Sequence, residues 1–188
     1  MSKNTQPEIY VSLDIESNGP NPGMNSMLSL GAAAFLRNDL ECKSTFSINF
    51  QPLANSSADP KTMEFWSKNQ AAYDATRENQ IHPMQAIPMF NAWAKQTAKQ
   101  FNARPVAVCY PVSFDWMFVS YYMARYTIEP FTHACIDLKS IAFAKLGKAY
   151  KGSGKKAWPK EWQVEGKHTH VAVDDAIEQG QQFIKVMS

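Results

Sequence analysis

The chain has 188 residues, of which 45% are hydrophobic, enough for a folded core and too many for a disordered polymer. No run approaches the ~18 consecutive apolar residues of a membrane span, so we expect no membrane partner. The N-terminus is polar without a secretory signal, and the three cysteines form no CxxC pair. These features predict one domain over residues 1–188, in the cytoplasm.

The formal net charge of +2 is unevenly distributed. Residues 139–167 carry eight lysines and two glutamates, so the remainder of the chain is acidic. The overlapping stretch from Lys148 to His168 is rich in lysine and carries glycines, and we expect an irregular insertion there. A basic segment suits a polyanionic partner such as nucleic acid, whereas the simpler interpretation is a solvated loop.

The first predicted element is a strand from Glu8 to Glu16, in which apolar residues alternate with others. Side chains two residues apart share a face, so Asp14 and Glu16 project from the same side. Two close carboxylates oppose each other's ionisation unless a cation lies between them. A central strand would therefore predict a divalent-metal site, and an edge strand would predict only solvated acids.

Turn residues follow at Ser17–Gly23, and two further strands are expected at Met27–Leu36 and Thr45–Phe50. Their close spacing favours an antiparallel meander of three strands. A helix is expected next, with Asp59 as its cap and its end near Tyr73.

A long helix fits residues 83–101, although Pro88 lies awkwardly inside it and favours a start near Ile87. The apolar run Arg104–Tyr110 then predicts a strand parallel to the first. Helices are expected at 113–126, 137–146 and 171–187. Together these elements predict an α/β fold: a mixed sheet of three antiparallel strands and then parallel ones, flanked by helices.

Two other places put acids in apolar surroundings. Asp115 lies in the first turn of an expected helix, and the run from His168 to Ala176 leads into the terminal helix. Each alone is explained by helix capping, because acids are favoured in first turns.

The order of these features resembles the DEDDh family of 3′–5′ exonucleases, which share the ribonuclease-H-like fold: Asp-x-Glu on the opening strand, Phe-Asp in mid-chain, then His-x4-Asp before the last helix. The resemblance spans nearly the whole chain and implies His170 as catalytic base. It also implies four metal ligands, of which Glu16 could additionally contact the 3′ sugar: Asp14, Glu16, Asp115 and Asp175.

Asp174 competes with Asp175 as a ligand, because the i to i+4 spacing would place it on the face of a helical His170. In the family the histidine precedes the aspartate by five residues. This spacing favours Asp175, with His170 on a loop before the helix. His168 does not stand five residues before Asp175, so it lacks the spacing found in the family.

The resemblance implies two Mg²⁺ or Mn²⁺ ions, a choice that oxygen ligands without cysteine also suit. Two ions about 3.5–4 Å apart can hold the attacking and leaving oxygens, while a neutral histidine takes a proton from water. The implied partner is the 3′ end of single-stranded nucleic acid, with RNA slightly favoured over DNA, and a homodimer is compatible with the family.

Substrate contacts are less specific in the sequence. Ser17-Asn18-Gly19 stands where many family members have Thr-Thr-Gly, and we expect it to line the path of the terminal nucleotide. Pro111 replaces a common Asn, so one polar contact is missing or supplied elsewhere. Trp66 could line the substrate groove or, more commonly for tryptophan, lie in the core. The insertion also contains three aromatic residues, which could stack against bases of the nucleic acid or only anchor the loop to the body of the protein: Tyr150, Trp158 and Trp162.

Two other functions remain open at this point. A nucleic-acid-binding protein could keep the fold without activity, although all five family residues are present. A phosphodiesterase for short oligonucleotides would prefer a dinucleotide to a long strand.

Overall fold

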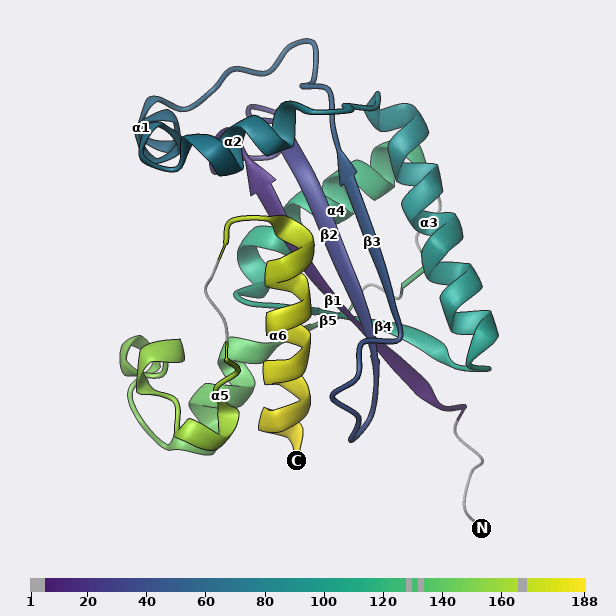
Figure 1. Ribbon diagram of the computed structural model, residues 1–188, viewed down its shortest axis with the longest axis vertical. Coiled ribbons are helices and arrows are strands. Elements are labelled where there is room, and N and C mark those ends of the chain that lie inside the picture. Colours follow the sequence, from purple (N-terminus) through teal and green to yellow (C-terminus); the bar gives the residue numbers. More distant parts are fainter. Residues whose placement is uncertain (1–5, 128–129, 132–133, 166–168) are drawn as a thin grey trace.

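The structure, a computed structural model, describes residues 6–127, 130–131, 134–165 and 169–188. It contains a five-stranded mixed sheet in the spatial order β3-β2-β1-β4-β5 (Figure 1). The first three strands form an antiparallel meander, and β4 and β5 continue the sheet in parallel with β1. The strands are β1 (Glu8–Ser17), β2 (Met27–Leu36), β3 (Ser44–Asn49), β4 (Arg104–Cys109) and β5 (Cys135–Asp137). The predicted fold class is confirmed, and β1 is the central strand.

Within the described residues, six α-helices accompany the sheet: α1 (Pro60–Lys68), α2 (Gln70–Arg77), α3 (Pro83–Gln100), α4 (Val112–Tyr126), α5 (Leu138–Leu146) and α6 (Ala172–Met187). The helix expected from Asp59 is in fact α1 and α2, because Asn69 leaves helical geometry at φ −127° and ψ 43°. In contrast, Pro88 does not delay α3, which already begins at Pro83. A proline there removes one backbone hydrogen bond, and the freed carbonyl belongs to Met84, whose side chain is exposed to water.

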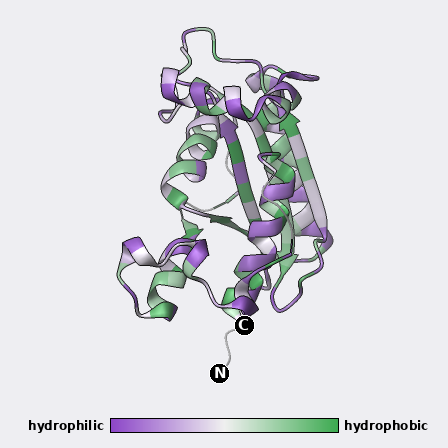
Figure 2. Ribbon diagram, turned by 60° about the vertical axis from the view of Figure 1, so that its left-hand side comes forward, coloured by the Kyte–Doolittle hydropathy of each residue, from purple (hydrophilic) through white to green (hydrophobic). Residues whose placement is uncertain are grey.

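The two faces of β1 contact different helices. Val11, Leu13 and Ile15 lie in a core with residues of α3 and α4. On the other face, Tyr10 packs against Phe183 of α6, with their ring centroids 4.9 Å apart. Figure 2 shows hydrophobic and hydrophilic bands along the strands of the sheet and hydrophilic colouring on much of α1 and α2. Because helices cover both faces, carboxylates at the end of β1 lie in a place where charge is costly.

β1 is longer than its pairing with β4, and this leaves room for side chains at its carboxyl end. The parallel ladder ends at Ser12 and Val108, whereas β1 continues to Ser17. Beyond that point the backbone of β1 bonds to side chains: the Ile15 N–H donates to Asp115 Oδ1 (3.3 Å), and Gln179 Nε2 donates to the Leu13 carbonyl (3.1 Å). Clefts at the carboxyl ends of strands are a common place for ligand sites in α/β sheets.

Helix α6 approaches β2 very closely at Gly31. A Cβ at this position would lie 2.1 Å from the carbonyl carbon of Ala172, so only glycine fits. Gly31 is also the partner of Asp14 in the β1–β2 ladder. The first turn of α6 is therefore held directly beside the acidic end of β1.

The described part of the Lys-rich insertion consists of three 3₁₀ turns: η1 (Tyr150–Gly152), η2 (Lys155–Ala157) and η3 (Lys160–Trp162). Trp158 is only 4% exposed, belongs to the core between α5 and α6, and donates its indole N–H to the Ser153 carbonyl (3.0 Å). This tryptophan therefore anchors the insertion, whereas Tyr150 is 47% exposed. None of the helices in the described ranges is long and apolar enough to span a membrane.

Candidate active site

A cavity of about 350 Å³ lies where β1, α4 and α6 meet. We call it the acidic cavity, because its lining includes all five residues expected at the site: Asp14, Glu16, Asp115, His170 and Asp175. These residues come from the end of β1, the first turn of α4, and the loop and first turn that open α6. The fold thus brings together groups that are up to about 160 residues apart in the sequence.

The two acids of β1 have strongly perturbed ionisation. Burial raises the pKa of Asp14 well above its ordinary value, and the charges of the neighbouring acids raise it further. Burial, followed by the charges of Asp175 and Asp115, raises the pKa of Glu16 to about 9. These carboxylates therefore favour either protonation or a nearby cation.

Asp115 is 3% exposed and lies in the first turn of α4. Burial raises its pKa to about 7, against the opposing effects of the backbone N–H groups it accepts from and of the Lys155 charge. Its hydrogen bond to the Ile15 N–H fixes the carboxylate beside β1.

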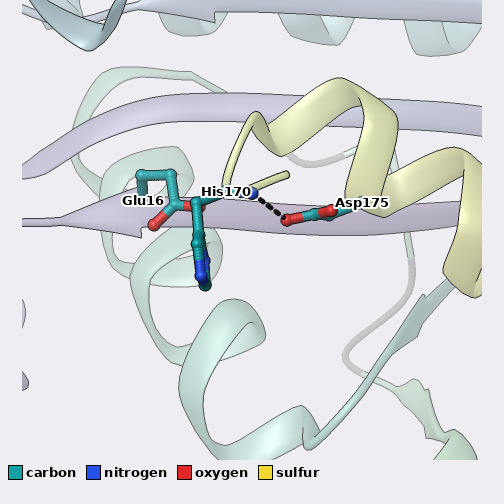
Figure 3. Close-up of side chains that lie close together, drawn as sticks. All are labelled: Glu16, His170 and Asp175. Carbon is teal, nitrogen blue, oxygen red and sulfur yellow. Dashed lines mark hydrogen bonds between the residues drawn. The ribbon is translucent and has the colours of Figure 1, made fainter. Parts of the chain in front are cut away.

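Asp175 holds the loop that carries His170. Its two carboxylate oxygens accept hydrogen bonds from the backbone N–H groups of Thr169 and His170, each at 3.1 Å. Figure 3 shows the bond from His170. His170 has a φ of 56°, a left-handed conformation that is uncommon for residues other than glycine. Asp174 is exposed and lines a neighbouring groove with Thr169, so of these two aspartates only Asp175 lines the acidic cavity.

Three of these side chains are close enough to share a cation. One carboxylate oxygen each from Glu16 and Asp175 and one imidazole nitrogen of His170 all lie within 4.8 Å of one another. Oxygen-rich groups suit hard cations such as Mg²⁺, and the described lining of the cavity contains no cysteine. The residues present therefore fit a divalent metal.

The residues expected along the substrate path have different surroundings. Asn18 accepts the Ser26 N–H through its side chain (2.7 Å), and a Cβ at Gly19 would lie 2.3 Å from Asn25. Both residues thus maintain the loop itself. Ser17 donates its hydroxyl to the Gly19 carbonyl (2.8 Å), and it also reaches a second cavity.

This second cavity, also about 350 Å³, is called the aromatic cavity here and is lined by Glu16, Ser17, Lys61, Thr62, Phe65, Trp66 and Phe114. Glu16 and Phe114 line both cavities, so the two adjoin. Trp66 is 2% exposed and donates its indole N–H to the Ser17 carbonyl (2.9 Å), which places most of it in the core. Its neighbour Phe65 is 40% exposed and contacts the His170 ring edge-on, with centroids 5.1 Å apart.

Several lining residues were not singled out as site residues from the sequence, namely Phe65, Phe114, Tyr110 and Lys155. Phe65 lies next to the tryptophan that was considered, and Phe114 fits equally well into the apolar stripe of α4. Lys155 is one lysine among eight in the basic segment. Only the tertiary arrangement distinguishes these residues from their neighbours. His168, the rejected alternative to His170, lies outside the described residues.

Residues 9–187 match the model of a family described as the 3′-5′ exoribonuclease Rv2179c-like domain. The chain is 30% identical over 180 residues to the 3′-5′ DNA exonuclease Cap18 of Escherichia coli, covering 95% of this chain and 91% of that protein.

Solved structures support the fold. The nuclease domain of 3′hExo, a DEDDh family member bound to rAMP, aligns with a TM-score of 0.72 at 11% identity, covering 96% of this chain and 92% of that one. The zinc-bound complex of E. coli ExoI with single-stranded DNA aligns with a TM-score of 0.61 at 13% identity, covering 95% of this chain and 39% of that one. At such identities the likeness concerns the fold alone.

Proposed function

Because the chain belongs to the 3′-5′ exoribonuclease Rv2179c-like domain family and is a 3′-5′ exonuclease, we propose that it removes nucleotides from single-stranded 3′ ends in a divalent-metal-dependent reaction. We favour RNA over DNA as substrate, in line with the family description. The name of the Cap18 relative supports DNA instead, so the experiment below compares the two. The observation that carries the proposal is the convergence of Asp14, Glu16, Asp115, His170 and Asp175 on one cavity.

The proposed metal ligands are the four carboxylates of Asp14, Glu16, Asp115 and Asp175, which would hold two Mg²⁺ or Mn²⁺ ions. Such ions, when bound, polarise the phosphate and stabilise the charge that develops on its oxygens. The protein's own part is to gather the acids on rigid elements, so that the cost of crowding them is met during folding and not during the reaction. The raised pKa values of Asp14, Glu16 and Asp115 agree with a site that is completed by cations.

His170 is the proposed general base. Its imidazole lies beside the carboxylates of Glu16 and Asp175, where an attacking water would also lie, and a ring nitrogen would take the proton from that water. Two contacts fix its position: Asp175 bonds to its backbone N–H, and Phe65 packs against the ring.

The aromatic cavity suits the terminal nucleoside. Phe65 and Phe114 offer apolar ring surface on which a base can stack, and stacking of this kind tolerates any sequence. Glu16 lines both cavities, so it is placed to contact the sugar between the base and the scissile phosphate.

The test uses single-stranded RNA and DNA of one sequence, labelled at the 5′ end and incubated with Mg²⁺, Mn²⁺ or EDTA. We expect a ladder that shortens from the 3′ end, faster on RNA, and no products with EDTA or with the D14N variant. A faster ladder on DNA would reverse the proposed preference. Release of internal fragments first, or a strong preference for a dinucleotide, would contradict the proposal.

A further inference from the structure

The acidic cavity contains a cation that the sequence analysis did not assign to the site. Lys155 lines it together with Asp14, Asp115 and His170. It is the only lysine or arginine among the described residues of this lining, which also includes a fifth acid, Glu178.

The insertion holds Lys155 in place through its contacts with Tyr110. The backbone N–H of Lys155 donates to the Tyr110 hydroxyl (3.2 Å), and its Nζ lies 5.2 Å from the centroid of the Tyr110 ring. Trp158 meets the same ring edge-on at 5.5 Å and is buried in the body of the protein. A flexible lysine is thus confined by a docked backbone and an aromatic face, at one wall of the cavity.

The size of the cavity decides what Lys155 can reach. At about 350 Å³ it is near the lower end of the roughly 300–1,000 Å³ typical of ligand sites, so Lys155, the acids and His170 surround one small space. A phosphodiester that enters a cavity lined with carboxylates needs positive charge from the protein as well as from bound cations. An ammonium group at the wall meets that need.

We propose, building on the exonuclease function above, that Lys155 binds a non-bridging oxygen of the scissile phosphodiester and stabilises its charge during cleavage. The Lys-rich insertion then contributes to the reaction through one confined side chain. Lys156, in the same 3₁₀ turn, is exposed and does not line the cavity.

The competing explanation is that Lys155 only neutralises the buried acids. Both roles predict that loss of the lysine strengthens cation binding in the absence of substrate, because a repulsive charge is removed. Only phosphate contact predicts weaker binding of a nucleotide. The experiment therefore measures metal and nucleotide separately.

The variants are K155Q and K155R, with K156Q as a control that removes the same charge one residue away. At saturating metal and substrate, K155Q is expected to lower kcat about 100-fold, the usual effect of losing one donor to a developing oxyanion. K155R, which keeps the charge in a different geometry, is expected to lie between K155Q and the wild type. K156Q is expected to stay within about twofold of the wild type.

A minimal substrate locates the contact. The 4-nitrophenyl ester of thymidine 5′-monophosphate contains the scissile phosphodiester and no other phosphate. K155Q should lose the same factor on this ester as on an oligonucleotide. A loss confined to the oligonucleotide would overturn the proposal, because it would assign Lys155 to a flanking phosphate. Recovery of full kcat at high Mg²⁺, or equal losses in K155Q and K156Q, would overturn it as well.

Binding of product without turnover gives a readout independent of activity. We expect K155Q to weaken the affinity for a nucleoside 5′-monophosphate, measured by calorimetry with Ca²⁺, at least about tenfold, as for a lost charge-assisted hydrogen bond. Unchanged affinity would overturn the proposal.

Tryptophan fluorescence, sensitive to the buried Trp158, checks that the insertion stays docked. An inactive wild type would contradict the exonuclease function itself, whereas an active wild type with an unaffected K155Q contradicts only the role of Lys155.

Discussion

The two halves of the acidic cavity are held in different ways. Asp14 and Asp115 project from a central strand and from the first turn of α4, so regular secondary structure places them. Asp175 and His170 belong to a helix start and its preceding loop, and there the carboxylate itself holds the loop through two backbone hydrogen bonds. The first half is placed by a strand and a helix, whereas the position of the second depends on one of its own ligand candidates, Asp175.

The largest expected effects come from D115N and D175N. Each removes a proposed metal ligand, and we expect exonuclease rates to fall at least about 10³-fold in both. The two variants should differ in structure, because an asparagine oxygen can still accept the Ile15 N–H, whereas one amide oxygen cannot replace two carboxylate acceptors for Thr169 and His170.

Hydrogen exchange at the amides of Thr169 and His170 tests this difference. It should accelerate in D175N and stay unchanged in D115N. Equal exchange in the two variants would show that the halves are held alike.

Removal of the imidazole should have the next largest effect. H170N is expected to lower kcat about 10²- to 10³-fold, the usual contribution of a general base. Asparagine tolerates the left-handed conformation of this position, so the loop should persist. The control is H82N, at the N-cap of α3, where an asparagine also caps well. Similar rates for H170N and the wild type would exclude His170 as the base.

The stability of the metal-free protein should fall as the pH rises. Glu16, with a pKa of about 9, and Asp115, with a pKa of about 7, keep their protons in the folded chain at pH values where the unfolded chain has lost them. The folded state then binds more protons, so its free energy of unfolding decreases with pH above about 4.5. With EDTA, Tm should be lower at pH 8 than at pH 5, and added Mg²⁺ should stabilise more at pH 8.

E16Q should reduce this pH dependence and stabilise the metal-free protein at pH 8 by about 1–3 kcal/mol. The matched control is E64Q on α1, an exposed glutamate paired with Lys68, which should leave the slope unchanged. A metal-free Tm that rises from pH 5 to pH 8 would contradict the raised pKa values that burial gives Glu16 and Asp115.

The smallest effect is expected at the aromatic cavity. F65A should raise KM about 5- to 100-fold, since one base–aromatic stack contributes about 1–3 kcal/mol. Phe143 is a suitable control, because it is 39% exposed compared with 40% for Phe65 and lies on α5. F143A should leave KM within twofold. An equal change in both variants would remove the argument for stacking at Phe65.

Much of the fold followed from local patterns. Alternation along β1 placed Asp14 and Glu16 on one face, and the antiparallel meander followed from short connections. In contrast, β5 was missed because its three residues are too few to show a pattern. The break at Asn69 was missed because neither glycine nor proline marks it.

The site was predictable only in part. The order of the acids and the histidine identified a family, and the structure brings those residues to one cavity. Sequence spacing could not reveal Phe65 or Lys155, which reach the two cavities through the docking of α1 and of the insertion. It also could not choose between Asp174 and Asp175 on physical grounds, because both fit the first turn of a helix.

The close approach of α6 to Gly31 has a consequence for the newly made chain. Asp14 and Asp115 lie in elements that leave the ribosome early, whereas His170 and Asp175 take up their places only when the sixteen residues of α6 settle over Gly31. Until then the acidic cavity lacks two of the five residues expected at the site, His170 and Asp175.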